Sequence, residues 1–90
     1  MSGNDGSRQV RHSRDSTRRL KRIDRRTARR IRDKIAVLAA DPGALANNIS
    51  ALKGAPGVMR LRIGNWRVIY AETPDVVHVL KIAPRGTVYD

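Results

Sequence analysis

The chain has 90 residues, of which 40% are hydrophobic and only three are aromatic. This length allows one domain with a modest core, and the absence of cysteine excludes disulfides and thiolate metal sites. Nineteen Lys and Arg against eight Asp and Glu give a formal net charge of +11, which favours nucleic acid as partner over a purely solubilising role for the charge.

The distribution of apolar residues indicates where in the cell the protein is expected. The longest apolar run, residues 35–40, is far too short to span a bilayer. The first eleven residues contain no apolar stretch of the kind found in secretory signals. We therefore expect a cytoplasmic protein without a membrane partner.

The N-terminal third is predicted to be helical and strongly basic. Residues 1–7 are rich in Gly, Ser, Asn and Asp and are expected to form a disordered tail before a single domain over residues 8–90. Weak alternation in residues 8–12 suggests a short strand. Ser13 is a suitable N-cap, with Asp15 in the first turn, for a helix that ends near Ile23.

A second helix is predicted to follow directly. Asp24 can cap it, and its apolar stripe recurs every three or four residues, at Ala28, Ile31, Ile35 and Leu38. The helix should end at Pro42 and Gly43. The two helices would form a hairpin with a basic outer face. That face includes Arg25, Arg26 and Arg29, for which a solvated surface and direct RNA contact both stay open.

The C-terminal half is predicted to be a connecting segment, residues 43–57, and then three strands. The strands are expected over residues 58–63, 66–72 and 76–82. Gly64-Asn65 suits a two-residue hairpin turn between the first two. The sequence therefore predicts an α+β fold.

A two-residue turn fixes which strand residues share a face. It sets Arg62 opposite Arg67 and gathers Arg60, Arg62 and Arg67 on one side. The other side is apolar, with Met59, Leu61, Ile63, Trp66, Val68 and Tyr70. In the third strand, a three-residue loop would put Val76, His78, Leu80 and Ile82 on the core side and Lys81 with the arginines. Like charges placed directly across a hairpin cost about 0.2–1 kcal/mol per pair, so this cluster indicates a site for a phosphate-rich ligand.

The residue types of the strand half also limit the chemistry. Arginine binds phosphate through two hydrogen bonds and stabilises charge that develops there, but it is a poor base. RNA supplies its own nucleophile in the 2′-OH, so no metal or cofactor is expected. Arg85 and Tyr89 are the nearby candidates for assisting proton transfer, and neighbouring arginines would lower the pKa of Tyr89. His/carboxylate metal spacings and phosphate-binding loops are missing.

The basic helical hairpin, "LKG", "RLRIGNWRVIY" and a final "R" and "VY" together resemble the RelE/ParE toxin superfamily. The resemblance covers residues 8–89 and is strongest to the RelE-like branch of bacterial type II toxin–antitoxin systems. It implies a helical hairpin packed on a small twisted antiparallel sheet. It also implies a ribosome-dependent endoribonuclease that cleaves mRNA in the A site and inhibits translation.

The same resemblance implies roles and partners. The positions that match the family motif are Arg60, Arg62, Arg67, Arg85 and Tyr89, and they are expected to be catalytic. Lys53, Lys81 and the helix arginines are expected to bind RNA. The implied partners are the ribosome, mRNA and a cognate antitoxin, acidic and encoded next to the toxin.

This chain departs from the family pattern at two points. The first two strand positions are lysines in the best-known members, one of them proposed as a base, but here they are Arg60 and Arg62, which favours charge stabilisation. Ala83-Pro84 stands where Gly-His or Gly-Lys is usual. Two alternatives stay open, a ParE-like inhibitor of DNA gyrase and a non-catalytic RNA-binding module.

Overall fold

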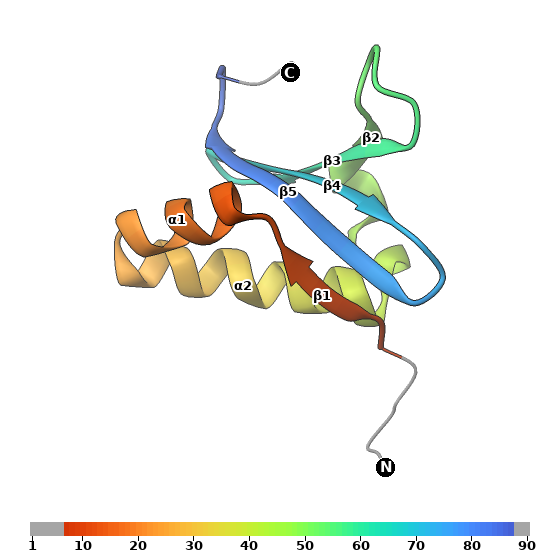
Figure 1. Ribbon diagram of the computed structural model, residues 1–90, viewed down its shortest axis with the longest axis horizontal. Coiled ribbons are helices and arrows are strands. Elements are labelled where there is room, and N and C mark those ends of the chain that lie inside the picture. Colours follow the sequence, from red (N-terminus) through yellow and green to blue (C-terminus); the bar gives the residue numbers. More distant parts are fainter. Residues whose placement is uncertain (1–6, 88–90) are drawn as a thin grey trace.

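The computed structural model describes residues 7–87, which form a helical layer packed on one face of a five-stranded sheet (Figure 1). The elements in chain order are β1 (Gln9–His12), α1 (Arg14–Arg22), α2 (Arg25–Ala40), the 3₁₀ helix η1 (Pro42–Asn48), β2 (Ile49–Ala51), β3 (Val58–Ile63), β4 (Trp66–Glu72) and β5 (Val76–Pro84). The predicted α+β fold with an N-terminal helical hairpin is therefore confirmed. Apart from Ser7, the tail expected to be disordered lies outside the described residues.

Both helices begin where side chains cap them. The Ser13 hydroxyl accepts a hydrogen bond from the Ser16 N–H at 3.0 Å, and an Asp24 carboxylate oxygen accepts one from the Thr27 N–H at 3.0 Å. These bonds satisfy N–H groups that the first helical turn leaves without partners. α2 ends at Ala40, two residues before Pro42, as the sequence predicted.

The sheet is mixed, with strand order β1-β5-β4-β3-β2. Strands β2 to β5 pair antiparallel, whereas β1 runs parallel to β5. The expected purely antiparallel sheet is thus corrected at one edge. The opposite edge also differs from expectation, because the segment predicted to be a mere connection contains η1 and β2, and β2 pairs with β3.

The β3–β4 hairpin has the predicted register. Arg62 lies opposite Arg67 and Ile63 opposite Trp66, on either side of a two-residue turn. Gly64 adopts a φ of +57°, a left-handed conformation that glycine reaches without strain. A Cβ at Gly64 would lie 3.0 Å from the Arg30 guanidinium, so a side chain there would require Arg30 to shift slightly in addition to the backbone strain.

A β-bulge interrupts the pairing of β4 with β5. Ile69 lies opposite Lys81 and Tyr70 opposite Val79, so Leu80 is an extra residue without a direct partner. One extra residue shifts the alternation of side chains between the two faces of the strand. β5 includes the predicted strand 76–82, but its residues before the bulge face the opposite side of the sheet from the side predicted.

The bulge makes part of the face assignment for β5 wrong. Val77 and Val79 are the fully buried core residues of this stretch, and beyond the bulge Ile82 is buried as predicted. Leu80 is 40% exposed. The residues wrongly expected to face the core are Val76, His78 and Leu80.

The core lies between α2 and the covered face of the sheet. It joins helix residues to strand residues, including Leu20, Ile31, Ile35, Leu38, Leu61, Val68, Tyr70, Val77, Val79 and Ile82. These core residues lie on one face of the sheet, so the helical layer leaves the other face uncovered. That face is where the strand arginines point.

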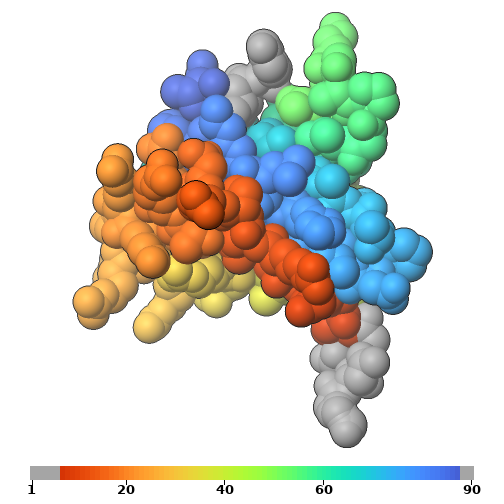
Figure 2. All heavy atoms as spheres, in the orientation of Figure 1, coloured from red at the N-terminus to blue at the C-terminus, as the bar shows by residue number. Residues whose placement is uncertain are grey.

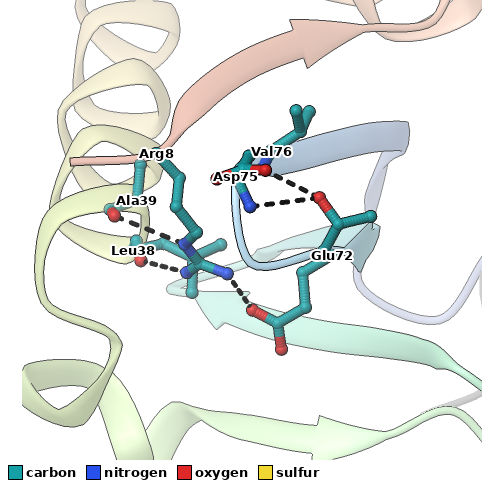
Figure 3. A network of polar contacts seen from close by, with 7 residues as sticks. Arg8, Leu38, Ala39, Glu72, Asp75 and Val76 are labelled. Carbon is teal, nitrogen blue, oxygen red and sulfur yellow. Dashed lines mark hydrogen bonds and ion pairs between the residues drawn. The ribbon is translucent and has the colours of Figure 1, made fainter. Parts of the chain in front are cut away.

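Arg8 links three distant parts of the chain (Figure 3). Its guanidinium donates to the Leu38 carbonyl at 2.8 Å and to the Ala39 carbonyl at 3.4 Å, and it forms an ion pair with Glu72. These carbonyls belong to the last turn of α2, which favours a cation. Arg8 therefore joins the start of β1 to the ends of α2 and β4.

Candidate nucleic-acid interface

The uncovered face of the sheet, which we call the cationic face, carries three transverse rows of side chains. The row nearest the β3–β4 turn consists of Arg62, Arg67 and Ala83. The second row consists of Ser50, Arg60, Ile69 and Lys81. The third row consists of Val58, Ala71, His78 and Arg11. Successive rows are two residues, or about 7 Å, apart along the strands.

An open hollow of about 360 Å³ lies over the first two rows. The strand arginines form its floor, and η1 and β2 supply the rest of its lining. The lining residues are Asn47, Asn48, Ile49, Ser50, Arg60, Arg62 and Arg67. The arginines were predicted from the sequence but the η1 and β2 residues were not, although the polar residues Asn47, Asn48 and Ser50, shortly before "LKG", were a usable signal.

Two of the three arginines are held by neighbours. Arg67 is only 7% exposed, and its Nη1 donates to the carbonyls of Gly64 and Trp66, both at 3.0 Å. Arg60 donates from Nη2 to the Ser50 hydroxyl at 3.1 Å. Arg62 is exposed. A guanidinium fixed in this way, as that of Arg67 is, needs little reorganisation when a negative charge arrives.

The residues after β5 approach the same end of the sheet. The Arg85 N–H donates to the Asn65 carbonyl at 2.7 Å, which places the Arg85 backbone beside the β3–β4 turn and next to the first row. The Arg85 side chain is exposed. Tyr89 lies outside the described residues, so its predicted place near the arginines stays a prediction.

The residues expected to bind RNA fall on different surfaces. Lys81 belongs to the second row, whereas Lys53 is exposed in the loop between β2 and β3 and does not line the hollow. The helix arginines line a separate depression of about 430 Å³ at the start of α2, formed by Arg25, Arg26 and Arg29. These three residues belong to α2, which is part of the helical layer that packs on the core face of the sheet (Figure 1).

The two histidines also lie on opposite sides of the sheet. Nδ1 of His12 is 3.1 Å from the buried Ser16 hydroxyl, on the helical side. Burial, followed by the charge of Arg32, lowers the pKa of His12 below its usual value. His78 lies in the third row, on the cationic face.

The lining of the hollow suits phosphate binding more than proton transfer. None of its lining residues is a histidine or a carboxylate. Within residues 7–87 no group of three or more His, Cys, Asp or Glu side chains is placed to hold a metal ion. None of the helices in that part of the chain is long and apolar enough to cross a membrane.

The solved structures that this chain resembles include proteins of toxin–antitoxin systems. The archaeal RelE–RelB complex from Pyrococcus horikoshii is 24% identical, with a TM-score of 0.74 over 91% of this chain and 99% of that chain. The RelBE2 complex from Mycobacterium tuberculosis is 20% identical, with a TM-score of 0.71 over 88% and 99%. The chromosomal ParDE system from P. aeruginosa is 12% identical, with a TM-score of 0.68 over 90% and 99%.

The sequence itself also matches a protein family. A search among curated proteins found no match. The family model described as the ParE toxin of the type II toxin-antitoxin system parDE, however, matches residues 10–89. Since the match spans most of the chain and the fold agrees, this protein belongs to the ParE toxin family of type II toxin–antitoxin systems, within the RelE/ParE superfamily.

Proposed function

We propose that this toxin is a ribosome-dependent endoribonuclease that cleaves mRNA in the ribosomal A site and so inhibits translation. The observation that carries the proposal is the hollow on the cationic face. Three arginines from two adjacent strands line it, and no acidic side chain is among its lining residues. A cluster of like charges that costs stability suits a ligand that neutralises it.

The proposed reaction is attack by the ribose 2′-OH on the adjacent phosphate. A bond forms between the 2′ oxygen and phosphorus, and the bond from phosphorus to the 5′ oxygen breaks. The proton of the 2′-OH passes to a base, and the departing 5′ oxygen takes up a proton. Arg67 and Arg62 would neutralise the charge that grows on the phosphate, a role that needs no metal ion.

Proton transfer requires a different group from the strand arginines. Arg60 and Arg62 keep their protons at any accessible pH, so we assign them charge stabilisation and binding. We assign proton handling to Tyr89 and a further cationic contact to Arg85, whose backbone lies beside the first row. The RNA of the message and the ribosome would be bound by Lys53, Lys81 and the three arginines at the start of α2, Arg25, Arg26 and Arg29.

A second candidate function follows from the family description, which names the ParE toxin. It is inhibition of DNA gyrase, a binding function without nuclease chemistry. Such inhibition does not require an arginine hollow or a tyrosine after β5, so the arrangement on the cationic face favours the nuclease. A non-catalytic RNA-binding module would need the charge but not Tyr89.

We also propose an acidic antitoxin, encoded next to the toxin, as the cognate partner. The solved structures of the same fold include complexes of toxin with antitoxin, as their descriptions state. A net charge of +11 on 90 residues is complementary to an acidic chain. Expression of the toxin alone should arrest growth, and co-expression of the neighbouring gene should restore it.

The proposed activity can be tested by primer extension on a translated mRNA after induction. Breaks inside codons, in the translated region only, are expected. In single-turnover cleavage of ribosome-bound mRNA, Arg85→Ala should slow the chemical step by about 10²–10³-fold. Tyr89→Phe should also slow cleavage while ribosome binding survives. Arg14→Ala, an exposed arginine at the start of α1, serves as the control and should cleave at the parent rate.

Two results would overturn the proposal. Intact mRNA together with inhibited supercoiling by purified gyrase would establish the second candidate instead. Parent-rate cleavage by both Arg85→Ala and Tyr89→Phe would move the reaction away from the cationic face.

A further inference from the structure

We propose that Leu80 and His78 form a nucleobase-binding subsite on the cationic face, next to the phosphate hollow. The inference deepens the proposed function, on which it rests, because it assigns part of the RNA substrate to residues outside the arginine cluster. It also uses the one stretch of β5 whose orientation differs from the sequence prediction.

The bulge is what brings Leu80 to this surface. Among the described residues, Leu80 at 40% and Val37 at 37% are the exposed large hydrophobic side chains. The helical layer covers the core side of β5, so an exposed side chain in the middle of this strand lies on the side of the cationic face. Bulges often re-aim a side chain beside a functional site, and this one turns a leucine outward between Val79 and Lys81.

His78 adds a planar ring to the same surface. It is partly exposed, lies two residues before Leu80, and has the small side chain of Ala71 opposite it on β4. Arg11 on β1 is its neighbour on the other side. Figure 2 shows that side chains of β5 reach the surface between β1 and β4. An apolar side chain and an imidazole are thus flanked by two cations, Arg11 and Lys81.

This arrangement offers binding partners for both parts of single-stranded RNA, the phosphates and the bases. Phosphates need cations, and unstacked bases need planar or apolar surfaces to stack on. In the second row, only Ile69 separates Arg60 from Lys81, which is two strand spacings or about 10 Å. A nucleotide whose phosphate occupies the hollow can therefore lay its base over β5. An acidic peptide would use the same cations but would have no need of the planar ring.

The subsite can be tested without the ribosome. Fluorescence anisotropy would compare the affinity of the purified protein for a short single-stranded RNA with that for an abasic ribose-phosphate of equal length. We expect the parent to bind the base-bearing strand about tenfold more tightly, as stacking of one base allows. Leu80→Ser and His78→Ala should reduce this preference to about twofold and leave the affinity for the abasic strand unchanged.

Matched controls come from the same chain. Val37→Ser removes the other exposed hydrophobic side chain, and His12→Gln removes the other histidine. Both controls should keep the tenfold preference. Equal affinity of the parent for both strands, or an equal loss in Val37→Ser and Leu80→Ser, would overturn the subsite. Thermal unfolding of each variant would establish that it is folded.

A second readout separates this inference from the proposed function. In ribosome-dependent cleavage, Leu80→Ser and His78→Ala should change the distribution of cleavage among codons more than the maximal rate. A parent protein that leaves mRNA intact would overturn the nuclease, yet the comparison of base-bearing and abasic strands would still decide the subsite. Variants that cleave the same codons in the same proportions as the parent would overturn the role of the subsite in specificity.

Discussion

Arg62 and Arg67 face each other across the β3–β4 hairpin, and replacing each in turn by glutamine should change stability in opposite directions. Arg62 is exposed and its direct cross-strand neighbour is another cation. Arg62→Gln removes one like-charge pair, which should raise the free energy of unfolding by about 0.2–1 kcal/mol. For a domain of this size, that corresponds to an increase in Tm of roughly 1–8 °C.

Arg67→Gln should be destabilising, because this guanidinium has a structural role as well. It is 7% exposed and donates to two backbone carbonyls at 3.0 Å each. Losing hydrogen bonds from a charged donor to partly buried carbonyls costs about 1.5–3 kcal/mol. Relief of the same like-charge pair returns about 0.2–1 kcal/mol, so the net loss should be about 0.5–3 kcal/mol.

Urea unfolding of the two variants and the parent would measure both effects. At about 1 M salt the Debye length falls to roughly 3 Å, so the gain in Arg62→Gln should vanish while most of the loss in Arg67→Gln remains. Arg14→Gln, an exposed arginine on α1, is the control for a general effect of net charge. The reasoning is refuted if Arg67→Gln is as stable as the parent, or if the Arg62→Gln gain persists in high salt. Both variants should lose mRNA cleavage. For Arg62→Gln, loss of cleavage together with higher stability would show that Arg62 contributes to the activity and not to folding.

Three further predictions concern other parts of the chain. Arg8→Met should lower the free energy of unfolding by about 2–3 kcal/mol in urea titration, because the last carbonyls of α2 lose their charged donor. Burial raises the pKa of Tyr70 to about 12 from about 10, so the native state holds this proton more tightly and stability should fall by about 2 kcal/mol between pH 10 and 12. Tyr70→Phe should lack that alkaline loss in thermal unfolding across this pH range. Reversing Arg25, Arg26 and Arg29 to Glu should weaken ribosome association and flatten its salt dependence in sedimentation assays, with an unchanged circular dichroism spectrum; unaltered association would mean that these side chains are merely solvated.

The helices and the hairpin could be predicted because their determinants are local. The Ser13 and Asp24 side chains each accept a hydrogen bond from the N–H three residues later in the chain. The Gly64-Asn65 turn alone sets the register that pairs Arg62 with Arg67. The floor of the hollow follows from that register and from alternation along two strands. Local sequence was therefore sufficient for the arginine cluster of the candidate site.

The bulge, β2 and the pairing of β1 could not be predicted, because they depend on contacts between residues far apart in the sequence. The bulge at Leu80 is defined only by the pairing of β5 with β4, so the faces of Val76 and His78 were assigned wrongly. β2 has three residues and exists only because β3 pairs with it, which is why the wall of the hollow was missed. The parallel register of β1 on β5 likewise joins segments far apart in the sequence.

That parallel pairing has a consequence for how the protein is made. β1 is the first strand to be synthesised and its partner β5 is the last in the sheet, and Arg8 likewise awaits Glu72. A nascent chain therefore cannot close its sheet, or assemble the rows that Lys81 and His78 complete, before β5 has left the exit tunnel. For a protein that acts on ribosomes, as proposed, this order delays the appearance of a finished binding face. If the proposed activity holds, the cationic face that binds the ribosome is completed only after β5 has been synthesised and has emerged from the tunnel.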